Sequence, residues 1–457
     1  MKVLPRRVVL VLAAAISLGG GRVAASPSGD DADPPDLEQP QVVGGQLEPG
    51  YPSAGFLLIS STRDGDYSAP ACGLTLVAPR AVVTAAHCVA YTPEALDEHY
   101  AVGFGVIDAT AEANIVGVTE IVVHPGYVPD GDPRYRHDVA VLILDRDMTE
   151  LAPELPVMSL GPALSIGQDL TYVGYGRTTP GGVEEAWVGG ERKSAGQQVE
   201  WDDGFSYGTV GSGGGLCWGD SGGPLLSDAA VYGVLADFDQ VFDCQVENAM
   251  VFTKLDAERS FIDGALADAA SAPAPTEIAA VTDWVASPDG GGSYTIEWQP
   301  VRYAASLAAP VVDLTLEGGE TIEVTIELEN AGNMAWIPGK TSIATDPAGR
   351  ESEFANDTWT SPTVAASVTA QTRPQAVGTY TFTVTAPEVD TDTLYREGFV
   401  LAHDGATAET VEAVDLDIIV TGPPDGGGGC GCGAGRGTGG WPTLFLLVGV
   451  LLVLRRR

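Results

Sequence analysis

Positive charge is scarce in this chain of 457 residues. Lysine and arginine together number 23, against 62 aspartate and glutamate residues, so the formal net charge at neutral pH is −39. Only four of the basic residues are lysine. A surface this acidic repels phosphate groups, which argues against nucleic acid as a partner.

Aromatic residues are also few, at 7%, and long apolar runs are confined to the two ends of the chain. Glycine (58) and proline (31) are abundant, while hydrophobic residues make up 44%, enough for packed cores. Many short apolar runs separated by turn residues are typical of β structure. Because the chain exceeds the length of one ordinary domain, we expect an all-β protein with at least two domains.

The first 41 residues predict export. Three basic residues precede an apolar run at residues 8–18, and small residues follow up to Ala25. This is the plan of a secretory signal peptide, which we place at residues 1–25. The run is too short for a membrane span, which needs roughly 20 residues. Residues 26–41 are rich in Pro, Asp and Glu and are interpreted as an unstructured pro-segment.

The C-terminal end, residues 422–457, predicts sorting to a membrane. A glycine-rich spacer contains Cys430 and Cys432, and an apolar stretch at 443–454 leads to three terminal arginines. This "CGCGAG…LFLLVGVLLVLRRR" end resembles the C-terminal sorting tags of myxobacterial surface proteins. The resemblance implies cleavage near the cysteines by a sorting protease and anchoring through a cysteine. The alternatives are a plain tail anchor and, less favoured, a metal site at the two cysteines.

The middle of the chain divides in two. We place one β domain at residues 42–268, with a helix near its end, a linker at 269–279 and a second β domain at 280–421. A further helix is predicted near residues 93–100. Apolar residues alternate with polar ones through residues 321–328, as in a strand with one buried face.

The second β domain is predicted to be a sandwich. Its segment "IELENAGNMAWIPG" resembles the Asn-x-Gly…Trp signature of the immunoglobulin-like module known from autophagy receptors and from bacterial exported proteins. Trp336 is expected in the core and Gly332 in a tight turn. Nothing in this domain indicates catalysis.

Three short motifs of the first domain carry the chemistry. "VVTAAHCV" places His87 after an apolar strand, "HDVAVLIL" places Asp138 before one, and "GDSGGPL" places Ser221 in a glycine-rich turn. A serine hydroxyl becomes a nucleophile when a base removes its proton, and a carboxylate holds that base in the required tautomer. The three residue types therefore indicate acyl transfer.

These motifs resemble the trypsin/chymotrypsin family of serine endopeptidases, over about 225 residues. The resemblance implies a pair of six-stranded β-barrels with the active site between them. It implies that His87 is the general base, that Asp138 orients the imidazole and that Ser221 is the nucleophile. The backbone N–H groups of Gly219 and Ser221 would form the oxyanion hole. This chemistry requires no metal and no cofactor.

The resemblance also implies how the enzyme is activated. The segment "VVGG" begins at Val42, whose free α-amine would pair with Asp220 once the pro-segment is cut. Gln41 stands where the family commonly has arginine, so another activating protease is expected. The resemblance further implies two disulfides, Cys72–Cys88 and Cys217–Cys244.

Specificity is expected from three positions of the implied pocket. Gly215 stands where trypsin-like members carry an aspartate, and Phe238 and Met250 align with pocket walls. The resemblance therefore implies cleavage after small or medium apolar residues.

Other positions depart from the family pattern or receive no role. Tyr175 replaces a tryptophan, and Ala236 replaces the serine whose hydroxyl supports the catalytic aspartate. His124 and His137 are assigned no role.

Together the sequence predicts a secreted serine endopeptidase anchored at the bacterial cell surface or outer membrane, acting on proteins or peptides. The rival interpretation is an inactive protease homologue that serves as a surface adhesin or binding protein.

Overall fold

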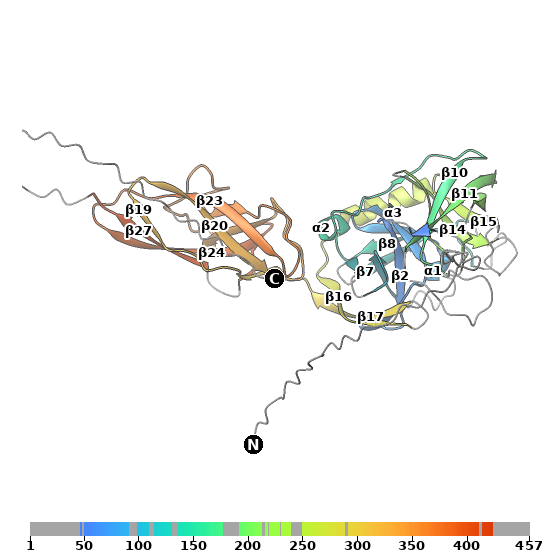
Figure 1. Ribbon diagram of the computed structural model, residues 1–457, viewed down its shortest axis with the longest axis horizontal. Coiled ribbons are helices and arrows are strands. Elements are labelled where there is room, and N and C mark those ends of the chain that lie inside the picture. Colours follow the sequence, from blue (N-terminus) through green and yellow to red (C-terminus); the bar gives the residue numbers. More distant parts are fainter. Residues whose placement is uncertain are drawn as a thin grey trace, which may run out of the picture.

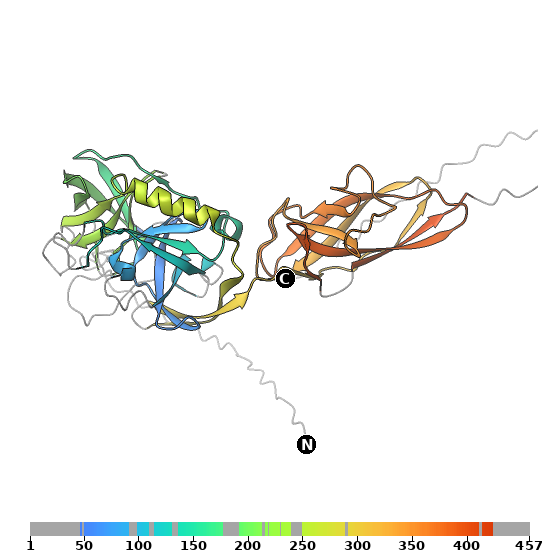
Figure 2. The same cartoon turned by 180° about the vertical axis from the view of Figure 1, so that it is seen from behind.

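The computed structural model consists of two lobes joined end to end (Figure 1, Figure 2). The first lobe lies within residues 46–300 and the second within residues 303–423. The structure describes residues 46–47, 50–90, 98–108, 114–129, 136–176, 192–212, 215–217, 219–228, 230–238, 249–287, 291–410 and 414–423. The predicted signal peptide and pro-segment, and residues 424–457 of the predicted sorting tag, lie outside them. No helix among the described residues is long and apolar enough to cross a bilayer.

Six strands of the first lobe form a closed barrel. Their order is β2-β4-β5-β8-β7-β6, and pairing of β6 with β2 closes it. The strands are β2 (Ala54–Ser60), β4 (Gly73–Ala78), β5 (Ala81–Thr84), β6 (His99–Phe104), β7 (Val116–Val123) and β8 (Ala140–Leu144). Two short helices follow β5 and β8, namely α1 (His87–Ala90) and α2 (Met148–Leu151).

A second six-stranded barrel follows in the same lobe. Its order is β11-β10-β13-β14-β15-β12, closed by pairing of β12 with β11. The strands are β10 (Asp169–Gly174), β11 (Lys193–Asp202), β12 (Ser206–Ser212), β13 (Pro224–Ser227), β14 (Ala230–Phe238) and β15 (Ala249–Lys254). The short strands β1 (Gln46–Leu47) and β9 (Ser159–Leu160) pair with β11 and β14.

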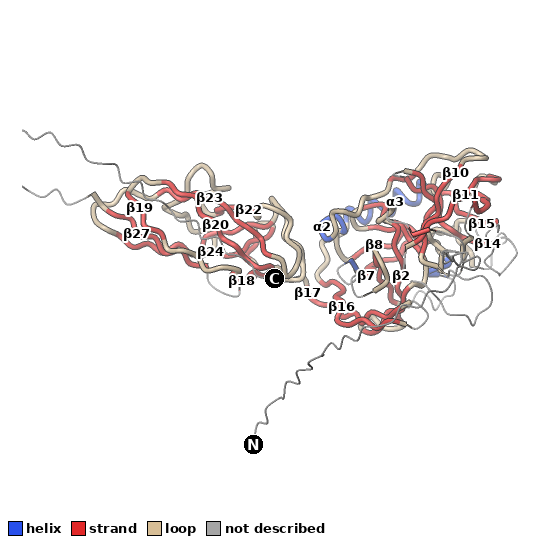
Figure 3. Tube along the Cα trace, in the orientation of Figure 1, coloured by secondary structure: helices blue, strands red, loops and turns tan. Residues whose placement is uncertain are grey.

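Helix α3 (Arg259–Ser271) follows the second barrel, as the sequence predicts (Figure 3). The helix predicted near residues 93–100 differs: residues 93–97 lie outside the described residues, and His99 and Tyr100 begin β6. These two residues pair with Ser60 and Ile59 of β2, so long-range strand pairing overrides the local helical pattern there.

The chain next adds two strands to the sheet of the first barrel. A β hairpin, β16 (Glu277–Ala286) and β17 (Gly292–Pro300), pairs through β17 with β3 (Gly65–Ala69), which in turn pairs with β2. Tyr294 lies opposite Tyr67, and both are fully buried. We expected a linker at residues 269–279 and the second domain from residue 280. The structure instead places the hairpin with the first lobe, because its apolar face completes a core there.

The second lobe is a β-sandwich. One sheet has the order β23-β20-β18-β26 and the other β19-β27-β24-β21-β22, with β25 on β24. The strands are β18 (Ala304–Leu307), β19 (Leu314–Glu317), β20 (Thr321–Asn330), β21 (Thr341–Asp346), β22 (Val364–Ser367), β23 (Val377–Thr385), β24 (Thr393–His403), β25 (Ala406–Thr407), β26 (Glu409–Thr410) and β27 (Val414–Thr421). The predicted fold class, a double barrel followed by a β-sandwich, is confirmed.

Both sheets of the sandwich share one core. Trp336 is fully buried in it, as expected. Gly332 is needed for close approach: a Cβ there would lie 2.3 Å from the carbonyl oxygen of Arg302. The backbone before β18 therefore packs directly on this glycine.

Polar contacts join the two lobes near α2. Lys340 Nζ lies 2.6 Å from Glu150 Oε1, and Arg373 donates to both carboxylate oxygens of Glu154 at 2.9 Å. The side chain of Gln371 donates to the backbone carbonyl of Glu150. Because these ion pairs are largely exposed, each is worth at most ~1 kcal/mol.

Candidate active site

His87 and Asp138 form a hydrogen-bonded pair at one end of the first barrel. His87 follows β5 and begins α1, whereas Asp138 precedes β8, the neighbour of β5. The imidazole Nδ1 lies 2.7 Å from Asp138 Oδ2, and the backbone N–H of His87 donates to Oδ1 at 2.8 Å. The side chain of Asp138 is only 2% exposed. The carboxylate thus fixes the ring from behind through Nδ1.

Ser221 belongs to the second barrel but lies against the strands that lead to His87. Its backbone carbonyl accepts from Gly73 N at 2.7 Å. The next residue, Gly222, has φ +77°, and a Cβ there would lie 2.2 Å from Thr84 Oγ1. Thr84 is the last residue of β5, three positions before His87. Glycine is therefore required for the serine turn to dock beside the histidine.

The predicted oxyanion-hole residues lie in this same turn. Gly219 adopts φ +93°, in the region that favours glycine. Ser221 is partly exposed, whereas its neighbours Asp220 and Gly222 are buried. The turn is thus held by its buried flanks and presents the serine toward the surface.

Asp220 is fully buried behind the serine. Its carboxylate accepts from Gly176 N at 2.9 Å, from Cys217 N at 2.8 Å and from the Tyr172 hydroxyl at 3.2 Å. Burial raises the pKa of Asp220 to about 6, and these hydrogen bonds together with the charge of Lys193 offset only part of that rise. Val42, its predicted partner after cleavage, lies outside the described residues.

This raised pKa predicts a pH-dependent stability of the unprocessed chain. A carboxyl with a folded-state pKa of about 6 stabilises the fold below its unfolded value near 3.8, and that contribution is lost as the pH rises through 6. Relative to Asp220→Asn, the wild type should lose about 2 kcal/mol of unfolding free energy between pH 4 and pH 6.5. Urea unfolding of both proteins at several pH values measures this. A difference that stays constant with pH would contradict it.

Of the three predicted specificity residues, the structure pairs two directly and connects the third to them through a neighbouring residue. Phe238 of β14 and Met250 of β15 are direct partners across the two strands. Met250 is fully buried in a cluster that also contains Leu216, which follows the buried Gly215. The sequence analysis missed Leu216, although its position next to Gly215 could have indicated it.

One predicted disulfide is described in full. Cys72 and Cys88 are bonded, which links the residue before β4 to the helix that begins with His87. Cys217 is also disulfide-bonded, but its expected partner Cys244 lies outside the described residues. Cys430 and Cys432 lie outside them as well.

Two substituted positions of the family pattern are explained by their contacts. The hydroxyl of Tyr175 donates to the carbonyls of Gly105 and Ala54, at 2.8 and 3.2 Å, and so joins the two barrels. Where Ala236 lacks a hydroxyl for Asp138, Thr253 Oγ1 donates to the backbone carbonyl of Asp138 at 3.0 Å. The aspartate is supported through its backbone there.

A polar cluster behind Asp138 was not predicted. His124 and His137 stack with ring centroids 4.5 Å apart, and both bond to Glu258. Ligand atoms of the three residues lie within 4.8 Å of one another, close enough to suggest a metal site. However, Gly126 N donates to His124 Nδ1, so Nε2 carries the ring proton and donates to Glu258. The nitrogen that a metal would need is already protonated, and we assign no metal there.

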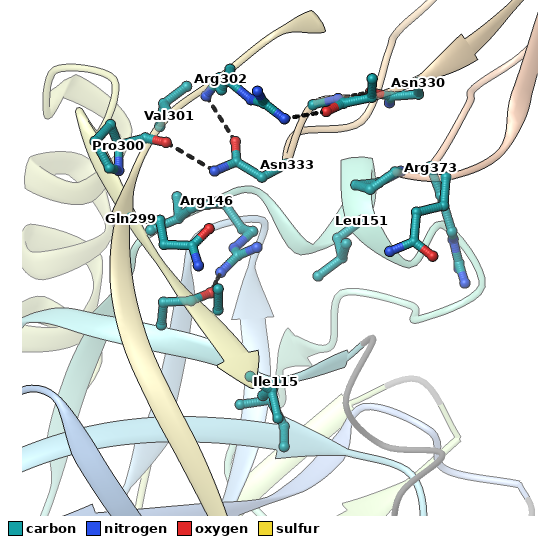
Figure 4. Close-up of a pocket in the computed structure, with 18 of the residues that line it drawn as sticks. Ile115, Arg146, Leu151, Gln299, Pro300, Val301, Arg302, Asn330, Asn333 and Arg373 are labelled. Atoms are coloured by element: carbon teal, nitrogen blue, oxygen red, sulfur yellow. Dashed lines mark hydrogen bonds between the residues drawn. The ribbon is translucent and has the colours of Figure 1, made fainter. Parts of the chain in front are cut away.

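A concave region of about 960 Å³ lies between the lobes and is unrelated to the serine turn (Figure 4). Three arginines line it, but each is already engaged. Arg146 binds Asp145, Arg373 binds Glu154, and Arg302 donates to the carbonyl of Ala331. These contacts hold the lobes and their connection in place.

Two closed six-stranded barrels, with a His–Asp pair on one and a serine turn of the other docked beside it, define a chymotrypsin-like class of protein. The chain belongs to the trypsin family of serine proteases. The sequence model of that family, trypsin, matches residues 43–262. A trypsin from Saccharopolyspora erythraea is 31% identical over 192 residues, covering 39% of this chain and 79% of that protein.

Two further proteins show how much of each chain the similarity covers. Phenoloxidase-activating factor 1 from Holotrichia diomphalia is 30% identical over 207 residues, covering 38% of this chain. The chain spans only 54% of the length of that relative. The solved structure of neuropsin, a serine protease of mouse brain, is 21% identical with a TM-score of 0.40, covering 49% of this chain and 98% of that structure.

Proposed function

We propose that this protein is a serine endopeptidase in which His87, Asp138 and Ser221 form the catalytic triad. The observation that carries the proposal is the bidentate contact of Asp138 with the imidazole and backbone of His87, beside the docked serine turn. Labelling of the processed enzyme with a serine-directed fluorophosphonate tests it. Absence of labelling in correctly folded, processed protein would favour the inactive-homologue alternative.

The proposed mechanism follows from the geometry of this pair. His87 Nε2 takes the proton of the Ser221 hydroxyl as its oxygen attacks the scissile carbonyl. Asp138, bonded to Nδ1, stabilises the imidazolium that forms. Backbone N–H groups of Gly219 and Ser221 would stabilise the oxyanion. The imidazolium then gives its proton to the leaving amine, and water hydrolyses the acyl-enzyme by the same steps.

Export and anchoring are part of the same proposal. A signal peptide at residues 1–25 and a pro-segment at 26–41 would precede the protease, and the C-terminal tag would anchor it at the cell surface. The sandwich would be an immunoglobulin-like adaptor without catalytic residues. The partners would be protein or peptide substrates, an activating protease and a sorting protease.

Specificity is proposed to be for small or medium apolar residues before the scissile bond. Gly215 brings no charge, and the apolar side chains of Leu216 and Met250 pack in the core cluster beside it. Burying an unpaired arginine among them would cost about 3 kcal/mol or more. Matched peptide substrates ending in Ala, Leu, Phe or Arg should therefore show kcat/KM for Ala or Leu at least about 100-fold above Arg. A dominant preference for Arg would refute this.

A further inference from the structure

Glu258 binds both histidines of the cluster behind Asp138 with a single buried carboxylate. Oε2 lies 3.1 Å from His124 Nε2, and Oε1 lies 2.8 Å from His137 Nδ1. The side chain of Glu258 is 5% exposed. It stands immediately before α3, whereas His124 follows β7 and His137 precedes β8. One carboxylate therefore ties the C-terminal helix of the first lobe to the segment that carries Asp138.

The backbone around Asp138 adopts a strained turn that depends on contacts from outside the segment. His137 has φ +55°, a left-handed conformation that is uncommon for any residue other than glycine. Val139 N donates to the carbonyl of His137 at 2.8 Å, which closes a three-residue turn centred on Asp138. His124 N in turn donates to the carbonyl of Val139 at 3.1 Å. Any relaxation of His137 would rotate Asp138 away from His87.

The histidine pair is enclosed on its other sides. The ring of Phe261 packs edge-on against His124, and that of Phe205 against His137. The Arg136 guanidinium lies beyond Phe205, 4.4 Å from its ring centroid. Besides Asp138 itself, Glu258 and Arg136 are the charged groups that these contacts place around the pair. The carboxylate thus has two N–H donors and an apolar surround, which makes its hydrogen bonds strong and directional.

We propose that Glu258 is a positioning residue of the protease: through His137 it holds the strained turn that presents Asp138 to His87. The inference rests on the proposed function of the triad. It also accounts for catalysis where Ala236 supplies no hydroxyl, because the aspartate is fixed through its backbone by Glu258–His137 and Thr253.

The test measures kcat and KM of processed enzyme, normalised to sites titrated with a fluorophosphonate, from pH 5 to pH 9. Glu258→Leu should lower kcat about 10- to 100-fold with KM nearly unchanged, because misplacement affects the chemistry and not substrate binding. The acidic limb of kcat/KM should also move to lower pH. A carboxylate held beside an imidazole favours the protonated imidazole, and a displaced Asp138 would no longer do this for His87. If Glu258 only stabilised the fold, its substitution would reduce the number of titrated sites and leave the acidic limb of kcat/KM at its wild-type pH.

Substitutions of His137 separate backbone strain from the bond to Glu258. Asparagine tolerates the left-handed conformation and can donate to the carboxylate, so His137→Asn should keep activity within about threefold. His137→Gly relieves the strain but removes the bond, and should lose activity as Glu258→Leu does. If Glu258→Leu fails to fold, these two variants still test whether the bond between His137 and Glu258 positions Asp138.

Glu397→Leu is the matched control. Glu397 is a carboxylate of equal exposure, 5%, bound to Arg350 in the sandwich. It should leave kcat per titrated site unchanged. Wild-type kcat and pH profile in both Glu258→Leu and His137→Gly would overturn the positioning role, while the triad would stand. A wild-type enzyme that neither labels nor hydrolyses peptides would overturn the proposed function itself, and this role with it.

Discussion

Replacing Ser221 with alanine is expected to lower kcat on peptide substrates by about 10⁴-fold or more. The hydroxyl is the only proposed nucleophile, and His87 has no proton to remove without it. His87→Ala should cause a loss of similar size, because the residues act as a unit. The residual rate would come from substrate binding and the oxyanion hole alone.

Ser227→Ala is the control for this experiment, since Ser227 ends β13 only six residues after Ser221. It should retain wild-type activity. Kinetics should be followed with one peptide substrate and with purified, processed protein. Retention of most activity by Ser221→Ala would refute the assignment of the nucleophile.

A chain that begins at Val42 is expected to be at least about 100-fold more active than the intact chain, the cost of a missing oxyanion-hole donor. In the unprocessed structure the Asp220 carboxylate is held by Gly176 N, Cys217 N and Tyr172. A new ammonium at Val42 would give this buried carboxylate a full opposite charge and so order the adjoining turn. The pKa of Asp220 should then fall below its present value of about 6.

The sharpest control is a chain that begins one residue earlier, at Gln41. It has the same domain content, but its ammonium is displaced by one residue and should not reach Asp220. Combining the Val42 start with Asp220→Asn should also abolish the gain. Equal specific activity of verified intact and Val42 forms would contradict this mode of activation.

The fold class could be predicted because the decisive signals are local. Short apolar runs gave the strands, and the region of α3 showed a helical pattern. The hairpin β16–β17 could not be placed, because its partner strand β3 lies more than 200 residues earlier. Alternation shows that such strands have a buried face but does not show which sheet they join.

The candidate site divides in the same way. His87, Asp138 and Ser221 each lie in a contiguous motif, so the sequence alone identifies them as candidates. Glu258 and His137 are 121 positions apart, and no motif of the sequence contains both of them. Only folding brings them together, and a lone glutamate before a helix resembles any other surface residue.

The hairpin β16–β17 also determines how the catalytic unit can be separated from the rest of the chain. A fragment cut at residue 268, where the sequence suggests a boundary, would uncover the edge of β3 and the apolar faces around Tyr67 and Phe56. An unpaired, apolar edge strand recruits other strands, so such a fragment would aggregate. A recombinant protease free of the sandwich must therefore extend at least through Pro300, and in evolution the two lobes could be exchanged only beyond that point.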